Sequence, residues 1–280
     1  MTPYFDNGQI VIYCGDNVKV LKHLGRDISD LTVTSPPYDN LRLYDGYSWN
    51  FEELSGRLFY ATVKGGVVVW VVADATINGS ETGSSFRQAL GFMKRGFKLA
   101  DTMVYAVKGT GAKGSNKTYW QGFEYMFVLS KGILKTSNRI ADIKNIHAGS
   151  TRAGRACVNG KPKNEPDHVD KNIGTRTNVW FYNVGYMDSS DKTAHPAPFP
   201  EALARDHIIS WSNEGDTILD PFLGSGTTTK MAQLLNRKAI GIELSEDYCK
   251  IAVERLSHKV AYSIPDEIGV KRKPIQLSLV

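Results

Sequence analysis

Two short segments of the chain carry groups suited to holding small molecules, and the first is Ser35-Pro36-Pro37-Tyr38. Consecutive prolines remove two backbone donors and fix φ at about −65°, so the carbonyl oxygens around them face no competing N–H group. Ser35 Oγ and the Pro36 carbonyl can accept both hydrogens of an amino group, and Tyr38 offers a flat face on which a ring stacks. The segment predicts a pocket for a ring that bears an amine. The alternative is a polyproline turn or a ligand for a proline-binding module.

The second segment is a glycine loop, Asp220-Pro221-Phe222-Leu223-Gly224-Ser225-Gly226. Glycines between a strand and a helix let the backbone turn tightly and approach a ligand, although Gly-Ser-Gly also serves as an ordinary turn. Glu243 ends the next predicted strand, 17 residues beyond Gly226. A carboxylate at that distance accepts hydrogen bonds from ribose hydroxyls in doubly wound nucleotide-binding folds. The alternative role for Glu243 is to cap the helix that starts near Ser245.

Apolar runs and helical periodicities alternate along the chain and would position these two segments. Strands are predicted at 9–13, 31–34, 67–72, 99–107, 123–129, 217–219 and 239–242. Helices are predicted at 18–24, 51–63, 86–93, 200–211, 227–235 and 247–256. Continuous apolar strands that alternate with helices predict an α/β fold, with a doubly wound and mostly parallel sheet covered on both faces.

Composition excludes several classes of protein. The 280 residues are 41% hydrophobic and 22% charged, which rules out a disordered, collagen-like or coiled-coil chain. Three cysteines without ligand spacing argue against a disulfide framework and a zinc site, so no metal is expected. The longest apolar run, 67–73, is too short to cross a bilayer, and we expect no secretory signal because residues 1–9 lack a basic region followed by an apolar run. We therefore expect a cytoplasmic protein with no membrane partner.

The positive charge of the chain is concentrated in residues 131–180. This segment holds ten basic and four acidic residues, whereas the rest of the chain sums to −1. It is rich in Asn, Gly, Ser and Thr and lacks clear periodicity, which predicts a loop-dominated surface. Such a surface is either a solvated, partly disordered insertion or a contact surface for a polyanion such as nucleic acid.

The two loops together resemble the catalytic and cofactor motifs of DNA amino-methyltransferases that use S-adenosylmethionine. Their order, with the catalytic motif first, the glycine loop last and a basic insertion between them, resembles the circularly permuted β class of that family. Three further stretches add to the resemblance: Cys14-Gly15-Asp16, Ala194-His195-Pro196-Ala197-Pro198-Phe199-Pro200 and Gly241-Ile242-Glu243.

The resemblance implies a Rossmann-like methyltransferase fold in four parts. Residues 1–130 would form the catalytic half, 131–185 a basic, loop-rich target-recognition insertion, 186–262 the cofactor-binding half and 263–280 a tail. The reaction implied is transfer of the methyl group of S-adenosylmethionine to an exocyclic amine of a base flipped out of duplex DNA.

The resemblance also assigns roles to individual residues. The catalytic residues it implies are Ser35, Pro36, Pro37 and Tyr38. The cofactor-binding residues it implies are Asp16, Phe199, Asp220, Phe222, Gly224, Ser225, Gly226, Thr227 and Glu243. For Asp220, a cap on its own loop is an equal alternative. In the basic segment, the candidates for DNA contact are Arg139, Asn145, Arg152, Arg155, Lys161 and Arg176.

Several alternatives stay open at the level of sequence. Cytosine C5 methylation would need a cysteine beside proline, which Cys14, Cys157 and Cys249 lack. In the family, serine at the first catalytic position leans towards cytosine N4, but it also occurs with adenine N6, so both bases remain. RNA or protein substrates and an inactive DNA-binding relative are the other candidates. A homodimer is expected by resemblance, and a restriction endonuclease partner is left undecided.

Overall fold

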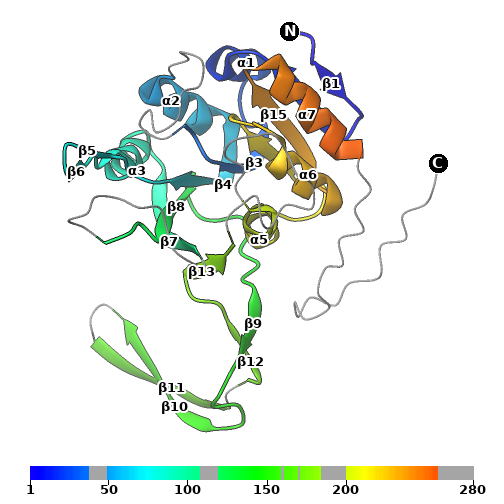
Figure 1. The fold of residues 1–280 in the computed structure, drawn as a ribbon. Helices are drawn as coiled ribbons and strands as arrows, with labels where there is room; N and C mark the ends of the chain where they lie inside the picture. Colours follow the sequence, from blue (N-terminus) through cyan, green and yellow to red (C-terminus); the bar gives the residue numbers. More distant parts are fainter. Residues whose placement is uncertain (38–48, 108–118, 159–160, 170, 184–199, 258–280) are drawn as a thin grey trace. The chain divides into compact units, whose positions relative to one another are not determined.

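The structure, a computed structural model, describes residues 1–37, 49–107, 119–158, 161–169, 171–183 and 200–257 (Figure 1). The side chains of 152–158 and 164–168 are not described. Contacts divide the chain into two compact units. The described residues of unit 1 fall within 1–138 and 178–257, and those of unit 2 fall within 139–177, apart from 159–160 and 170. Unit 2 therefore lies within the basic segment.

Unit 1 is built on one large sheet. In the described part of the chain it has nine strands in the order β1-β2-β15-β14-β3-β4-β8-β7-β13. Their bounds are β1 Phe5–Asp6, β2 Ile10–Cys14, β3 Ser29–Thr34, β4 Thr62–Val72, β7 Lys98–Val107, β8 Phe123–Ser130, β13 Val179–Tyr182, β14 Thr217–Asp220 and β15 Lys238–Glu243. A short hairpin, β5 (Thr76–Ile77) and β6 (Ser80–Glu81), follows β4.

The central strands of this sheet run in one direction. β2, β15, β14, β3 and β4 pair with their neighbours in parallel. β8 runs antiparallel between β4 and β7, and β13 lies parallel to β7 at the edge. The carboxyl ends of β14, β15 and β3 therefore meet at the same edge, which is where ligands bind in open α/β sheets.

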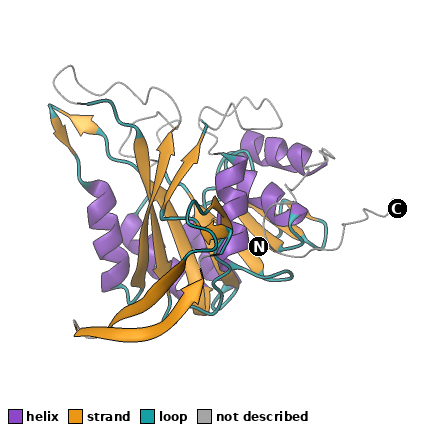
Figure 2. Ribbon diagram, turned by 90° about the horizontal axis from the view of Figure 1, so that it is seen from below, coloured by secondary structure: helices purple, strands orange, loops and turns teal. Residues whose placement is uncertain are grey.

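Helices cover both faces of the sheet (Figure 2). α1, α2 and α3 contact one another in series, as do α5, α6 and α7. Their bounds are α1 Asn17–Leu24, α2 Phe51–Ala61, α3 Ser84–Lys94, α5 Glu201–Trp211, α6 Thr227–Leu234 and α7 Glu246–Ser257. The predicted α/β fold with a doubly wound, mostly parallel sheet is confirmed.

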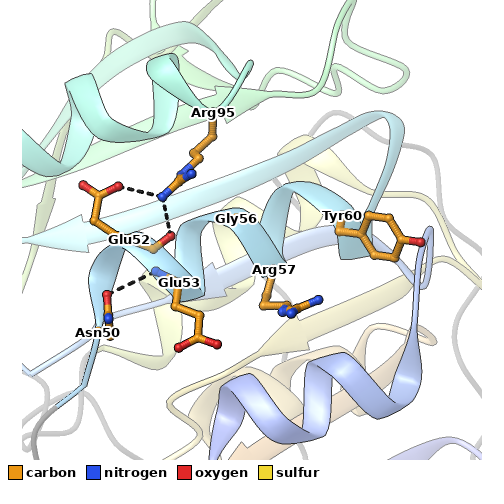
Figure 3. Close-up of a pocket in the computed structure, with 7 residues that line it drawn as sticks. All are labelled: Asn50, Glu52, Glu53, Gly56, Arg57, Tyr60 and Arg95. Atoms are coloured by element: carbon orange, nitrogen blue, oxygen red, sulfur yellow. Dashed lines mark hydrogen bonds and ion pairs between the residues drawn. The ribbon is translucent and has the colours of Figure 1, made fainter.

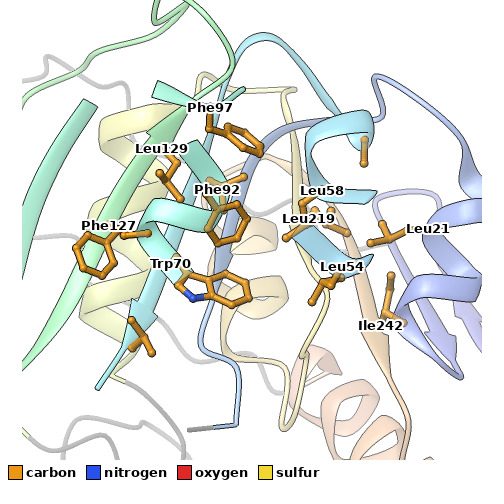
Figure 4. Close-up of a cluster of buried hydrophobic side chains, with 14 of the residues drawn as sticks. Leu21, Leu54, Leu58, Trp70, Phe92, Phe97, Phe127, Leu129, Leu219 and Ile242 are labelled. Atoms are coloured by element: carbon orange, nitrogen blue, oxygen red, sulfur yellow. The ribbon is translucent and has the colours of Figure 1, made fainter. Parts of the chain in front are cut away.

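β4 shows why the central strands are continuous apolar runs. Every residue from Val67 to Val72 is at most 1% exposed, because alternate side chains point to opposite faces and both faces are covered. Val68, Trp70 and Val72 enter a cluster with α1, α2 and α3. The Trp70 ring lies 5.0 Å from that of Phe92, edge to face (Figure 4). This packing fixes β4 beside β3.

The prediction of a helix over 51–63 is wrong at its end. α2 stops at Ala61, and Thr62 and Val63 already belong to β4. Thr62 has an extended backbone, and its Oγ1 donates to the Leu58 carbonyl at 2.7 Å. β-branched residues favour the strand, so the change of structure comes before Gly65 and Gly66 rather than at them.

Unit 2 consists of two small antiparallel sheets. β10 (Thr151–Val158) pairs with β11 (Lys161–Val169), and β9 (Ala141–Lys144) pairs with β12 (Ile173–Thr175). The expectation of a loop-dominated surface is therefore wrong for this segment. Its strands escape detection because their sequences do not show the apolar alternation by which half-buried strands are recognised.

Helices that could span a membrane and side-chain clusters that could bind a metal are both absent from the described residues. None of the helices in those residues combines the length and the apolar character needed to span a bilayer. The same part of the chain holds no group of three or more His, Cys, Asp and Glu side chains placed to bind a metal ion.

Candidate functional site

The two predicted loops lie side by side at the carboxyl edge of the sheet. β14 pairs with β3 in parallel, with Ile218 opposite Leu31 and Leu219 opposite Thr32. From β14 the chain passes through α6 to β15 on one side, and from β3 it passes through α2 to β4 on the other. Strand order therefore reverses between β14 and β3. This is the switch point at which a crevice opens in doubly wound sheets.

A direct side-chain contact joins the two loops. Thr34, the residue before Ser35, donates from Oγ1 to Asp220 Oδ1 at 2.7 Å. Thr228, on the first turn of α6, donates from Oγ1 to the Val33 carbonyl at 3.1 Å. Both contacts are buried, so they hold the end of β3 against the glycine loop without competition from water.

Asp220 is buried at this junction, with 1% exposure. Its Oδ1 also accepts from the Phe222 amide at 3.1 Å, so the residue does cap its own loop. Its Oδ2 is buried and has no hydrogen-bond partner in the described structure. Burial raises the pKa of Asp220 to about 6, although the Thr34 and Thr228 hydroxyls and the Phe222 amide oppose the rise. The negative charge of Glu243 raises the pKa further.

Glu243 holds the glycine loop from the neighbouring strand. Its Oε2 accepts from the Gly224 amide at 2.8 Å, and its Oε1 accepts from the Leu244 and Ser245 amides at 2.9 Å each. Burial raises the pKa of this carboxyl despite those three bonds. Glu243 thus both supports the turn before α7, as the capping alternative supposed, and points towards the glycine loop.

The backbone of the glycine loop needs its glycines. Gly224 and Gly226 have φ of 51° and 82°, in the left-handed region that glycine adopts without strain. Gly241 matters for a different reason, because a Cβ there would lie 2.7 Å from Leu223 Cδ1. The missing side chain lets Leu223 pack on β15. The sequence motif Gly241-Ile242-Glu243 includes this glycine but does not reveal the packing that requires it.

Phe222 projects into an aromatic group that sequence analysis missed. Its ring lies 5.2 Å from that of Trp49 and 6.3 Å from that of Trp70. Trp49 is half-buried and precedes α2. A single tryptophan in a polar stretch gives no periodic signal, so only the fold brings it to the site.

The remaining predicted site residues of unit 1 are placed as follows. Ser35 and Pro37 are half-buried and Pro36 is buried directly after β3. Asp16 is exposed and caps α1 by accepting from the Lys19 amide at 2.8 Å. Its neighbour Asn17 donates from Nδ2 to the Pro221 carbonyl at 3.1 Å, which brings this turn to the glycine loop. Tyr38 and Phe199 lie outside the described residues.

The DNA-contact candidates lie in unit 2 and differ in their surroundings. Arg176 is paired with Asp142, and its Nε lies 2.8 and 2.9 Å from the two carboxylate oxygens, which ties β12 to β9. Arg139 and Lys161 are exposed, and Asn145 Oδ1 accepts from the His147 amide at 3.0 Å. Arg152 and Arg155 lie on β10, in the part whose side chains are not described.

A groove on the surface of unit 1 lies apart from these residues. It is lined by Asn50, Glu52, Glu53, Gly56, Arg57, Tyr60 and Arg95, from α2, the residue before it and the residue after α3 (Figure 3). Arg95 pairs with Glu52 across it at 2.7 Å. None of the residues predicted for catalysis or cofactor binding lines the groove.

Comparison with known proteins gives consistent matches. The family model described as DNA methylase matches residues 29–254. The orphan methyltransferase M.BamHII of Bacillus amyloliquefaciens is 51% identical over 250 residues, which cover 85% of this chain and 92% of that protein.

Two solved structures share the fold. The cytosine-N4-specific PvuII DNA methyltransferase matches with a TM-score of 0.68 and 18% identity, covering 92% of this chain and 89% of that one. The complex of M1.HpyAVI with S-adenosylmethionine matches with a TM-score of 0.59 and 22% identity, covering 89% and 100%.

The raised pKa of Asp220 predicts a specific dependence of stability on pH. The folded state holds this proton more tightly than the unfolded chain, so the free energy of unfolding falls as pH rises from about 4 to about 6, then levels off. The fall from this group is up to about 3 kcal/mol. Asp220→Asn keeps an acceptor for Thr34 and does not titrate. In urea unfolding, the free energy of unfolding of Asp220→Asn minus that of wild type should therefore increase by up to about 3 kcal/mol between about pH 4 and about pH 6.

Ser80→Ala is the control for this measurement, because Ser80 lies on β6 with an exposed side chain that does not titrate. This variant should follow the pH dependence of the wild type. A constant difference between wild type and Asp220→Asn from about pH 4 to about pH 7 would contradict the assignment.

Proposed function

The chain belongs to the DNA methylase family of N6-adenine and N4-cytosine methyltransferases, and from that premise we propose which of its residues carry the reaction. It is an S-adenosylmethionine-dependent enzyme that methylates an exocyclic amine of DNA. The observation that carries the residue assignment is the 2.7 Å hydrogen bond from Thr34 to Asp220. It joins the proposed amine-binding segment to the proposed cofactor loop.

The glycine loop has features that fit the cofactor. Asp220 Oδ2 is a buried acceptor that a ligand donor can satisfy, and Glu243 presents a carboxylate beside Gly224. The bound cofactor supplies an electrophilic methyl group on a positively charged sulfur. We assign its binding to Asp16, Phe199, Asp220, Phe222, Gly224, Ser225, Gly226, Thr227 and Glu243. In this assignment Glu243 accepts from the ribose hydroxyls, as carboxylates at this position do in related folds.

Ser35 and Pro36 hold and polarise the target amine. The exocyclic amine of adenine or cytosine is a poor nucleophile because its lone pair is delocalised into the ring. Acceptors at Ser35 Oγ and the Pro36 carbonyl favour a pyramidal nitrogen whose lone pair is directed at the methyl donor. Pro37 fixes the direction of the Pro36 carbonyl, and Tyr38 stacks on the base. The proton is lost to water after transfer.

The target base must leave the duplex to reach this edge of the sheet. An amine that is paired inside a helix cannot be approached by both Ser35 and a cofactor on the glycine loop, so we propose that the base is flipped out. Ser35 and Pro36 accept the hydrogens of an exocyclic amine. Adenine and cytosine both carry this group, so these two contacts do not select one base over the other. Digestion of methylated DNA to nucleosides, followed by mass spectrometry, identifies which of the two bases is modified.

Unit 2 is proposed to contact the DNA. Its exposed basic side chains include Lys161 and Lys163 on β11, and phosphate neutralisation by such residues supplies most non-specific affinity. We keep Arg139, Asn145, Arg152, Arg155 and Lys161 as candidates for direct contact. Arg176, paired with Asp142, is proposed to act by shaping this unit as well.

We also propose that the enzyme is a homodimer that acts in the bacterial cytoplasm, where its DNA substrate lies. A specific DNA site buries roughly 1,000–2,500 Å² of protein surface, which is demanding for one small domain. Sedimentation velocity should show a dimer in the presence of duplex DNA. A monomer with and without DNA would refute this assembly.

Ser35→Ala and Tyr38→Ala test the catalytic assignment. Each variant should lower kcat for methyl transfer to duplex DNA by about 100-fold or more, because the amine loses an acceptor or a stacking surface. Binding of S-adenosylhomocysteine, measured by calorimetry, should stay within about twofold of wild type, since neither residue is assigned to the cofactor.

Ser80→Ala, at an exposed serine of β6, is the matched control and should keep full activity. RNA and protein are the comparison substrates. Wild-type activity in the double variant Ser35→Ala/Tyr38→Ala, or labelling of RNA or protein but not DNA, would overturn the assignment.

Lys161→Ala/Lys163→Ala tests the role of unit 2. The double variant should weaken binding to all duplexes alike and reduce the slope of log affinity against log salt by about 2, because each phosphate contact contributes about 0.9. Lys238→Ala is the control. It removes an exposed lysine at the amino end of β15, away from the carboxyl edge that carries the glycine loop, and it should leave the slope unchanged. An unchanged slope in the double variant would refute the contact.

A further inference from the structure

Three charged side chains are buried together behind the glycine loop. Glu201, Lys230 and Arg255 come from α5, α6 and α7, and each is at most 2% exposed. Glu201 Oε1 lies 3.0 Å from Lys230 Nζ and 2.8 Å from an Arg255 terminal nitrogen, NH2. One carboxylate oxygen thus links all three helices on this face of the sheet.

Arg255 extends this network to the loop itself. Its other terminal nitrogen, NH1, donates to the Ser225 carbonyl at 2.7 Å and to Ser225 Oγ at 3.0 Å. The same nitrogen lies 3.2 Å from Thr227 Oγ1. A planar guanidinium presents donors in a fixed geometry, so it can fix the peptide after Ser225 and the first residue of α6 at the same time.

Stability alone is a weak explanation for this network. Removing charges from water is costly, and replacing a buried ion network with apolar side chains of similar volume is often neutral or stabilising. The network instead contacts the part of the loop where Gly226, with φ of 82°, is the left-handed N-cap from which the chain enters α6. Conformational specificity at a functional loop is therefore the role that its placement favours.

We propose that Arg255, held in place by Glu201 and Lys230, is a positioning residue that keeps Ser225 to Thr227 in the conformation that binds S-adenosylmethionine. This inference rests on the proposed assignment of the glycine loop to the cofactor. Arg255 acts through the loop, so its loss should affect the binding of the cofactor rather than the chemistry that follows binding.

The experiment compares Arg255→Lys with Arg237→Lys. Arg237 offers a matched control, because it is also 2% exposed and donates to the Ser212 carbonyl at 2.9 Å, but it lies in the turn before β15. Each substitution replaces a buried guanidinium and its several N–H donors with a single ammonium group, so both should lower the melting temperature. Calorimetric titration with S-adenosylhomocysteine and steady-state kinetics are then measured on each folded variant.

Arg255→Lys should weaken S-adenosylhomocysteine binding tenfold or more and raise KM for S-adenosylmethionine by a similar factor. Its kcat at saturating cofactor and its KM for DNA should stay within about twofold of wild type. Arg237→Lys should change neither cofactor affinity nor KM. Cofactor affinity equal to wild type in Arg255→Lys, or an equal loss in both variants, would overturn the proposal.

A second substitution covers the case in which Arg255→Lys does not fold. Glu201→Gln keeps the shape of the side chain and one acceptor oxygen but removes the charge, and it should weaken cofactor binding in the same direction by a smaller factor. Unchanged affinity in this variant would contradict the role of the network.

Glu243→Gln and Phe222→Ala separate this inference from the assignment beneath it. If both variants bind S-adenosylhomocysteine as wild type does, the glycine loop is not the cofactor site and the underlying proposal fails. If both lose affinity while Arg255→Lys and Glu201→Gln keep it, only the positioning role fails.

Discussion

The hydrogen bond from Thr34 Oγ1 to Asp220 Oδ1 is the contact on which the site depends. It joins β3 to β14 through two residues that lie 186 positions apart in the sequence, at the point where strand order reverses. Methyl transfer needs a nucleophile and an electrophile held in line at short range, and fixed geometry supplies much of the rate enhancement in such reactions. A rigid junction between the two loops meets this need better than either loop alone.

The rest of the sheet edge supports the junction from three sides. Glu243 binds the Gly224 amide from β15, Asn17 binds the Pro221 carbonyl from α1, and Arg255 binds Ser225 from α7. This arrangement depends on which strands are neighbours and not on their order in the sequence. A chain with the Ser35-Pro36 segment first and the glycine loop last therefore keeps the two segments side by side.

Sequence could predict the parts of this site that are local. Ser35-Pro36 and Gly224-Ser225-Gly226, which stay predictions as site residues, stand out in the sequence because strand ends, prolines and glycines leave signals in short windows. Thr34, Trp49 and Arg255 gave no such signal, since their roles come from contacts with residues far along the chain. The strands of unit 2 were missed because their sequences lack the apolar alternation that identifies half-buried strands.

A crystal structure of the enzyme with S-adenosylhomocysteine tests the central claim most directly. We expect the adenosyl group beside Gly224 and Glu243, with the sulfur directed across the junction of Thr34 and Asp220 towards Ser35 and Pro36. A ligand bound elsewhere, for example in the groove on α2 between Asn50 and Arg95, would contradict it. So would a ligand on the glycine loop whose sulfur points away from Ser35.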